Sequence, residues 1–440
     1  MFASGRRQRG GLALVLAALA LVLAACGSGS GSGTTTTAAA SSSSTTASSG
    51  SSTTASSGSS TTSGGTSSKG PIIIGAVIDE SNYMKSFDDP ALYAAEIEAK
   101  KINSQGGVGG RQIEFKVYND KLDPSLTRSD ALAAVSAGAQ ILWVTCDVDL
   151  ATPAVQVGLS KHLLTVSPCI GTNQMGPARF GPAGKLAFTF GNAPQNDGSA
   201  LARLLLAHGW KTATVVTDKS LAYFIDVCQY FTTAFTQLGG HVVSQLTYTA
   251  GDHTAGQVGN RAAQAGGAAT VLCSTSNPDL PTFVTAERTA GNAKPIVGPW
   301  AIDGGFWEPS SPTISNNIWI TTYASSFGDD PNPKVNTLVQ ELAAEGHRPV
   351  TGGFVTGPTA VEGIVNAIQK AHGSLDGSTL AGIIQSYSNF PTISGNVSFS
   401  TTFHSVVGRS YRVIEVTKDK PHYVGMQSPG PVSFVTPLKP

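Results

Sequence analysis

From residue 71 onward, short apolar runs rich in β-branched residues alternate with longer segments that have the periodicity of amphipathic helices. The expected strands include 72–77, 113–118, 141–144, 163–166, 213–217, 242–248, 270–272 and 318–323. The expected helices include 125–137, 195–208, 221–238, 279–289, 334–345, 354–371 and 378–386. This alternation predicts an α/β fold with parallel sheets that are covered by helices on both faces.

The length of this patterned segment indicates two lobes. It comprises 370 residues, whereas a single hydrophobic core rarely grows beyond about 250–300 residues. Near its beginning, Asp88-Asp89-Pro90 predicts the start of a further helix, because an acidic residue caps a helix and proline suits its first turn. Gly106-Gly107 predicts the end of that helix.

The N-terminal residues have a different character and predict export. Three arginines precede an apolar stretch, 12–23, which is too short to span a membrane and is typical of a signal peptide, residues 1–25. The sequence Leu23-Ala24-Ala25-Cys26 resembles the lipobox of bacterial lipoproteins, so Cys26 is expected to be lipidated at the outer surface of the cell membrane. The alternative is an ordinary secretory signal with an incidental cysteine. Residues 26–70 consist mostly of Ser, Thr, Gly and Ala and predict a flexible tether.

The chain lacks the sequence signatures of several functional classes. The chain has 28 basic and 28 acidic residues, and its lysines and arginines are scattered, which argues against nucleic acid or an anionic membrane face as a partner. The glycines at 106–110 follow a helix and precede a strand, whereas a phosphate-binding loop follows a strand. The folded region has no G-x-S-x-G motif and no histidine pair with metal-ligand spacing. We therefore expect no enzymatic activity, no cofactor and no metal.

Besides Cys26, four cysteines remain in a chain that is expected to enter an oxidising compartment. Their order along the chain favours disulfides between Cys146 and Cys169 and between Cys228 and Cys273, because each pair lies within one run of alternating elements. Four cysteines allow three pairings, and buried free thiols are an equal alternative.

Short motifs follow one another in a fixed order along the folded region. They are KINSQGGVGGRQI at 101–113, Asp120 with Asp123-Pro124, VSP at 166–168, LGGHVV at 238–243, NAIQKA at 366–371 and GNVSF at 395–399. In this order they resemble the branched-chain amino-acid binding proteins, which are the type I periplasmic binding proteins of ABC importers. Each motif alone is a common helix boundary in α/β proteins, so the ordered set over about 75 to 425 carries the resemblance.

The resemblance implies two doubly wound lobes joined by a three-segment hinge, with a small polar molecule trapped between them. The implied first lobe comprises 71–190 and 324–405, and the second comprises 191–323 and 406–428. It also implies a monomer that captures its solute outside the cytoplasm and delivers it to ABC permease subunits. The alternatives are a ligand-sensing receptor of the same fold without transport and, third, a hydrolytic enzyme.

The resemblance places candidate ligand-binding residues in loops that follow strands of the first lobe. These residues are Tyr83, Asp147, Asp149, Ser167 and Thr172. The two aspartates depart from the family, whose corresponding loop typically offers hydroxyl groups, and they would repel a solute carboxylate. They favour a cationic or hydroxyl-rich solute over a simple amino acid, unless they cap the following helix instead.

In the second lobe the candidates are Tyr223, Ser274 and Asp303. Tyr223 belongs to 218–223, which resembles the segment whose aromatic residue lines the family's cleft. Asp303 lies where the family often has an acidic partner for the solute's amino group. Ser274 follows a strand and offers either a hydroxyl for the solute or a helix cap.

One aromatic wall of the family's cleft is in question. Pro358 stands where many relatives carry a tyrosine. That wall is either missing or supplied by Trp300, Phe306 or Trp307, although such aromatic residues more often belong to the core.

Overall fold

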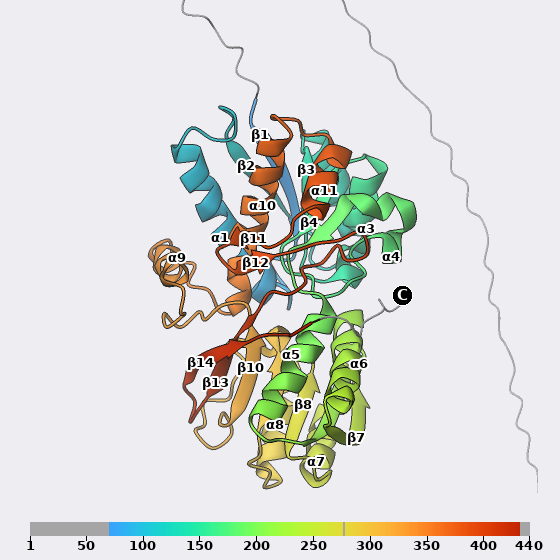
Figure 1. The fold of residues 1–440 in the computed structure, drawn as a ribbon, viewed down its shortest axis with the longest axis vertical. Helices are drawn as coiled ribbons and strands as arrows, with labels where there is room; N and C mark the ends of the chain where they lie inside the picture. Colours follow the sequence, from blue (N-terminus) through green and yellow to red (C-terminus); the bar gives the residue numbers. More distant parts are fainter. Residues whose placement is uncertain (1–69, 276–277, 432–440) are drawn as a thin grey trace, which may run out of the picture. The chain divides into compact units, whose positions relative to one another are not determined.

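The structure is a computed structural model that describes residues 70–275 and 278–431. The expected signal peptide, Cys26 and all but the last residue of the tether lie outside these ranges. The described residues alternate between strands and helices, which confirms the expected α/β class (Figure 1). They all belong to one compact unit, and their strands form two main sheets.

The first sheet contains five parallel strands in the order β2-β1-β3-β4-β5. The strands are β1 (Ile72–Ile78), β2 (Ile113–Asn119), β3 (Ile141–Val144), β4 (Leu164–Ser167) and β5 (Ala187–Thr189). In the centre, Ile74 of β1 pairs with Phe115 of β2 and with Ile141 of β3. Strand β3 is buried on both faces, and such strands appear in a sequence as continuous apolar runs.

Helices cover both faces of this sheet. They are α1 (Lys85–Ser104), α2 (Pro124–Ser136), α3 (Val148–Ser160), α10 (Thr356–Lys370) and α11 (Gly377–Gln385). Helix α2 packs against α3, whereas α1 packs against α10, which also contacts α11. Right-handed crossovers from β1 to β2 and from β2 to β3 run in opposite directions along the sheet, so they place α1 and α2 on opposite faces. Helix α10 lies more than 250 residues after α1 in the chain yet packs beside it, as its orange colour next to the blue α1 shows in Figure 1.

The second sheet has the strand order β14-β13-β10-β9-β8-β6-β7. Its strands are β6 (Thr212–Asp218), β7 (His241–Tyr248), β8 (Ala269–Cys273), β9 (Ile296–Pro299), β10 (Ile318–Thr322), β13 (Tyr411–Val416) and β14 (Pro421–Gln427). Its helices are α5 (Pro194–Ala207), α6 (Ala222–Gln237), α7 (Ala255–Gln264) and α8 (Leu280–Thr289), of which α5 packs on α6 and α7 on α8. Strands β13 and β14 are antiparallel and were not among the expected strands. Strand β14 has no fully buried residue, so it lacks the apolar run of the inner strands.

Three segments of the chain pass between the two sheets. The first follows β5, the second follows β10, and the third precedes β13. Between the second and third passages lie α9 (Pro333–Ala344), α10, α11 and a hairpin of β11 (Phe390–Thr392) and β12 (Gly395–Val397). The remaining short elements are α4 (Pro177–Phe180), η1 (Gly181–Leu186), η2 (Trp300–Ile302) and η3 (Gly352–Val355). This path supports the proposed lobes, 71–190 with 324–405 and 191–323 with 406–428.

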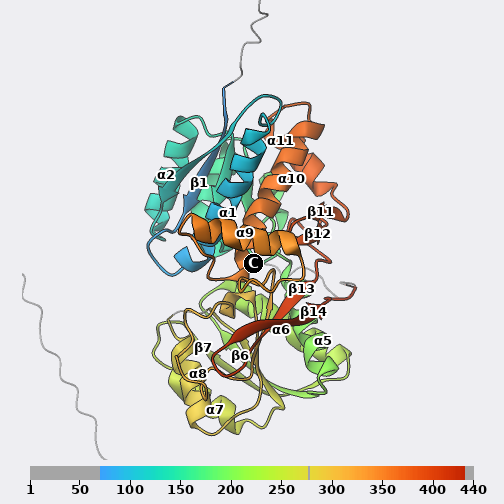
Figure 2. The same cartoon turned by 90° about the vertical axis from the view of Figure 1, so that its left-hand side faces the viewer.

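Helix α9 lies against α1 (Figure 2). Two ion pairs connect them, from Lys100 to Glu345 just beyond α9 and from Lys101 to Glu341, each at 2.7 Å. These four side chains are substantially exposed, so the pairs add little to stability. They do indicate that α9 stays with the first lobe.

A buried arginine holds the three passages together. Nε of Arg409, in the third passage, donates to Asn192 Oδ1 and Nη2 donates to the carbonyl oxygen of Phe190, each at 2.9 Å. Its Nη1 donates to Ser394 Oγ in the β11–β12 turn at 2.9 Å. The guanidinium also lies 4.4 Å from the ring centre of Tyr323 in the second passage. Arg409 thus fixes the region about which the lobes would hinge.

The expected start of the first helix is wrong. Helix α1 begins at Lys85, so Asp88 lies inside it rather than at its cap. The Asp88 carboxylate instead accepts hydrogen bonds from the backbone N–H of Asp79 at 3.0 Å and of Cys146 at 2.8 Å. It also accepts one from Thr145 Oγ1 at 2.6 Å. These bonds connect the ends of β1 and β3, a tertiary role that the local sequence does not reveal.

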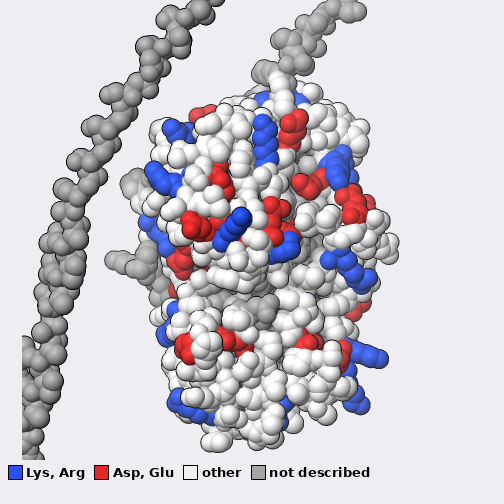
Figure 3. Space-filling model, turned by 180° about the vertical axis from the view of Figure 1, so that it is seen from behind, with Lys and Arg blue, Asp and Glu red and all other residues white. Residues whose placement is uncertain are grey.

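Charged side chains of both signs are interspersed on the face shown in Figure 3.

In the described part of the chain, no helix has both the length and the apolar character that a membrane span requires.

Candidate functional site

The carboxyl ends of parallel strands from both sheets meet at a small cavity. Its wall consists of residues that follow β1 and β3 in the first sheet and β6, β8 and β9 in the second. These residues are Met84, Phe87, Cys146, Asp147, Leu221, Tyr223, Phe224, Thr275, Trp300 and Ala301. Open α/β sheets bind their ligands at this edge. The cavity volume is about 20 Å³, which is room for about one water molecule, so the lobes are closed upon each other.

Asp147 supplies the carboxylate in this wall. Its Oδ1 accepts hydrogen bonds from the backbone N–H of Asp149 at 2.8 Å and of Leu150 at 3.2 Å, and so caps α3. Burial, with a smaller contribution from the charge of Asp149, raises the pKa of Asp147 to about 7. Helix capping and solute contact were alternatives in the sequence, and the structure shows the cap while also placing Asp147 in the wall.

Aromatic residues from both lobes close the cavity. Tyr223, in the first turn of α6, donates its hydroxyl to Asp197 Oδ2 at 3.0 Å. The Trp300 ring packs edge to face on Phe87, with 5.3 Å between ring centres, and its centre lies 6.0 Å from that of Tyr223. Trp300 Nε1 is buried and has no acceptor among the described residues. Leaving a buried N–H without an acceptor costs about 1–3 kcal/mol of stability, and a ligand that offers an acceptor would recover this energy.

Two disulfides fasten the elements around the cavity. One joins Cys146 to Cys169, and the other joins Cys228 to Cys273, the pairs that the order of the cysteines favoured. The first connects the loops after β3 and β4, and the second connects α6 to the end of β8. Asp88 lies close enough to the first pair to resemble a metal site, but bonded sulfur atoms are not thiolate ligands.

Hydrogen bonds join the two lobes beside the cavity. Asp149 Oδ2 accepts one from the backbone N–H of Ala222, the first residue of α6, at 3.0 Å. The other carboxylate oxygen of Asp149 pairs with Arg179 at 2.6 Å. Thr172 Oγ1 donates to Asp226 Oδ2 at 3.0 Å, and Thr172 is fully buried. Asp149 and Thr172 therefore contact the other lobe rather than the cavity.

Asp303 also has its partners inside the protein. Its Oδ2 accepts hydrogen bonds from Thr322 Oγ1 and from the backbone N–H of Gly352, each at 2.6 Å. Its Oδ1 accepts one from the backbone N–H of Gly304 at 2.8 Å. Burial raises the pKa of Asp303 to about 6. Asp303 joins the second lobe to the segment before α10 and is not part of the cavity wall.

The other predicted residues lie near the cavity but outside its wall. Ser167 Oγ donates to the carbonyl oxygen of Thr145 at 3.2 Å, and Ser274 Oγ is hydrogen-bonded to the hydroxyl of Tyr248. Tyr83 is 36% exposed, and burial of its hydroxyl, followed by the charge of Asp147, raises its pKa. Of the eight predicted ligand residues, the wall therefore contains Asp147 and Tyr223.

Sequence reasoning did not select most of the wall. It missed Met84, Phe87, Leu221, Phe224, Thr275 and Ala301, and it named Trp300 only as one possible aromatic wall. Position relative to the expected strands could have found Thr275 and Ala301, because each comes shortly after a strand end. The apolar residues of α1 and α6 carry no such signal, because their periodicity is that of any helix that packs on a sheet.

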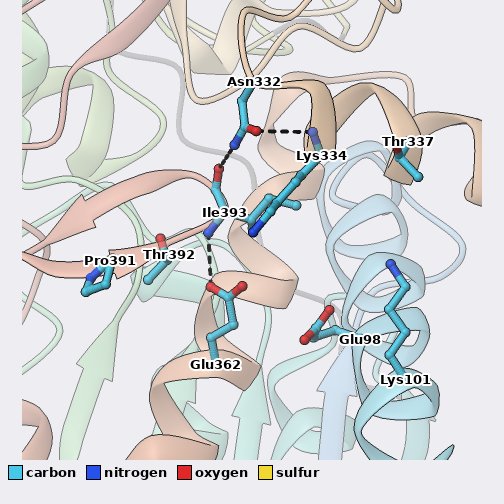
Figure 4. A pocket seen from close by; sticks show the side chains of 9 residues that line it. All are labelled: Glu98, Lys101, Asn332, Lys334, Thr337, Glu362, Pro391, Thr392 and Ile393. Carbon is cyan, nitrogen blue, oxygen red and sulfur yellow. Dashed lines mark hydrogen bonds between the residues drawn. The ribbon is translucent and has the colours of Figure 1, made fainter.

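A larger cavity lies on the first lobe, away from these strand ends. It measures about 600 Å³ and lies between α1, α9, α10 and the β11–β12 hairpin (Figure 4). Glu362 accepts a hydrogen bond from the backbone N–H of Ile393 there, and Asn332 links Ile393 to the first turn of α9. Glu98 and Lys101 of α1 complete the acidic and basic lining. All of its lining residues belong to the first lobe, so a solute bound there would not contact the second lobe.

The sequence profile of the periplasmic binding protein family matches residues 71–421. This range contains every residue of the cavity wall. The chain belongs to this family. The resemblance of its motifs is thereby confirmed, and the family is one of exported solute-binding proteins.

Solved structures of this family share the fold. A leucine binding protein from Thermotoga maritima superposes with a TM-score of 0.69 and 17% identity, covering 81% of this chain and 99% of its own. A branched-chain amino acid transporter substrate binding protein from Streptococcus pneumoniae, in complex with isoleucine, has a TM-score of 0.69, 18% identity and coverages of 81% and 99%. A solute binding protein from R. palustris, in complex with benzoate, has a TM-score of 0.67, 19% identity and coverages of 81% and 97%. No curated protein sequence matches the chain.

Proposed function

We propose that this periplasmic binding protein captures one small solute between its two lobes outside the cytoplasm and delivers it to the permease subunits of an ABC importer. The observation that carries the proposal is the cavity at the facing strand ends, whose wall is built by both lobes. A solute held there contacts both lobes at once and therefore favours the closed arrangement. Relatives of this fold carry isoleucine or benzoate in their complexes.

Opening of the lobes is required before a solute can enter, because the closed cavity holds about one water molecule. The bonds from Asp149 to Ala222 and from Thr172 to Asp226 must then break. Each contributes about 1.5–3 kcal/mol when its acceptor is a charged carboxylate, and solute binding has to offset this loss. Closure around the solute excludes water and strengthens its polar contacts with the wall.

We expect the purified protein to respond to its solute by a higher temperature of unfolding, since a ligand at 100 times its Kd stabilises by about 2.7 kcal/mol. Thermal unfolding in the presence of pooled amines, amino acids, carboxylic acids and polyols measures this response. Ala301→Trp fills the cavity and should abolish it. Ala290→Trp, at the exposed end of α8, is the matched control and should retain it. A folded Ala301→Trp protein with undiminished solute affinity would place the binding site elsewhere.

The same proposal includes a lipid anchor at Cys26. Its support is the arginine-rich and apolar N-terminus followed by Leu23-Ala24-Ala25-Cys26. In cells of a bacterium that makes lipoproteins, the full chain should be found in the membrane fraction, and Cys26→Ser should release it or block its maturation. Ser44→Ala, within the expected tether, is the control and should leave the fractionation unchanged. Equal membrane association of a Cys26→Ser protein whose signal peptide has been removed would refute the anchor.

A further inference from the structure

We infer that the solute is a compact organic ammonium ion without a carboxylate. The inference rests on the proposed function, since it assigns the chemistry of the same cavity. Three features of the wall carry it: a buried carboxylate without a cation, an aromatic enclosure, and one unpaired N–H donor.

The first feature is the free oxygen of Asp147. Both cap bonds reach Oδ1, and no described residue donates a hydrogen bond to Oδ2. The side chain is 4% exposed and lines the cavity. A buried carboxylate requires a compensating donor or cation, and an ammonium group supplies both.

The protein itself does not supply that cation. Arg179 is close enough to act on Asp147, but its guanidinium is paired with Asp149 at 2.6 Å. The cavity wall contains neither lysine nor arginine. Burial disfavours the ionised form of the Asp147 carboxyl, which a cationic solute would stabilise and a solute carboxylate would destabilise further.

Other buried carboxylates near the cavity have the same sign. Oδ2 of Asp218 at the end of β6 is buried without a described partner, whereas Asp89 on α1 already pairs with Lys85. The raised pKa of Tyr83 has burial as its main cause, followed by the charges of Asp147, Asp79, Asp218 and Asp88. Carboxylates of both lobes therefore lie close enough to the Tyr83 hydroxyl, beside the cavity, to affect its pKa.

The aromatic enclosure suits the apolar part of such an ion. Phe87 comes from the first lobe, whereas Tyr223, Phe224 and Trp300 come from the second. Aromatic rings bind the alkyl groups of a cation by burial and attract its charge through their faces. A hydroxyl-rich solute would leave its polar groups unpaired against these rings.

The unpaired Trp300 Nε1 adds one further requirement. This donor is buried, and a Cβ atom added to Gly171 across the lobes would lie 3.2 Å from it. A neutral acceptor on the solute, such as an ether or carbonyl oxygen, would satisfy it without adding negative charge. The best solute thus combines an ammonium group, a short apolar body and one neutral oxygen.

Isothermal titration calorimetry of the purified protein with matched probes tests the inference. The probes are butylammonium, 1-butanol, pentanoate, 2-methoxyethylammonium, leucine and benzoate. Butylammonium should bind at least about tenfold more tightly than 1-butanol, since the two differ mainly in charge, and pentanoate should bind more weakly still. The ether oxygen of 2-methoxyethylammonium should improve on butylammonium.

Variants separate the charge of Asp147 from its role in the fold. Asp147→Asn preserves a good helix cap and should weaken butylammonium about 30-fold or more while leaving 1-butanol unchanged. Asp123→Asn is the matched control, because Asp123 caps α2 in the same way at an exposed site, and it should change the Kd less than about twofold. Trp300→Phe should remove the advantage of 2-methoxyethylammonium over butylammonium.

The outcomes distinguish this inference from the proposed function. Binding of leucine, benzoate or pentanoate as tight as that of the ammonium probes, with no effect of Asp147→Asn, overturns the inference and leaves a solute-binding protein. Absence of binding by every probe also overturns it. If, in addition, no pooled solute raises the unfolding temperature of the protein, the proposed function fails as well.

Discussion

Replacing Gly357 by alanine is expected to lower the free energy of unfolding by about 3 kcal/mol. Gly357 lies in the first turn of α10, where that helix crosses α1. An added Cβ would lie 1.8 Å from the carbonyl oxygen of Ala91, and the next nearest atoms also belong to the Ala91 backbone. Backbone cannot move aside as a flexible side chain does, so the two helices must separate and lose packing on both sides.

The matched control is Gly382→Ala in α11. Gly382 is exposed, and an added Cβ would have no atom within 4 Å. Alanine has the higher helix propensity, so this change should stabilise the protein by about 0.5–1 kcal/mol. Urea unfolding of both variants measures the difference, which should have opposite signs at the two glycines. A Gly357→Ala protein as stable as the unmodified chain would show that α1 and α10 are not in close contact.

Replacing Arg409 by methionine should cost about 3–5 kcal/mol, the range found when one partner of a buried charged network is removed. Methionine keeps much of the length and loses all three hydrogen bonds, to Asn192, Ser394 and Phe190. It also leaves Asp197, whose carboxylate the Arg409 charge stabilises, without that compensation. The lost hydrogen bonds should loosen the region between the lobes, because their partners lie where the chain passes from one sheet to the other.

Denaturant unfolding measures this loss, and Arg128→Met is its control. Arg128 is exposed on α2, so its replacement should change the stability by less than about 0.5 kcal/mol. Arg409→Lys should recover only part of the loss, because an ammonium cannot donate in the planar fork that serves Asn192 and Phe190 together. A fully stable Arg409→Lys protein would mean that charge alone, without directed hydrogen bonds, holds the three passages.

The sequence predicted strands correctly where every residue of the strand is buried. The run 141–144 is buried at every residue, and its prediction as a strand agrees with β3. Edge strand β14 was missed, because a strand with neither face fully buried has no apolar pattern to detect. The start of α1 was misplaced because Asp88 has the residue type of a helix cap while its partners, Thr145 and Cys146, are distant in the chain.

The site was only partly accessible. Asp147 and Tyr223, which line the cavity, were among the predicted residues because the family resemblance points to loops that follow strands. Asp149, Thr172 and Asp303 have polar side chains at similar positions, yet their hydrogen bonds join the lobes or the passages between them. Sequence position alone cannot tell a residue that faces a cavity from one that faces the other lobe.

The sequence by itself determined the alternation of strands and helices and the family, because both depend on residue order along a single chain. Only the tertiary structure decided which side chains surround the cavity and which donors and acceptors stay unpaired there. Those properties arise where two sheets meet, between residues such as Phe87 and Trp300 that are far apart in the sequence. Burial and pairing are relations between segments, and local pattern does not contain them.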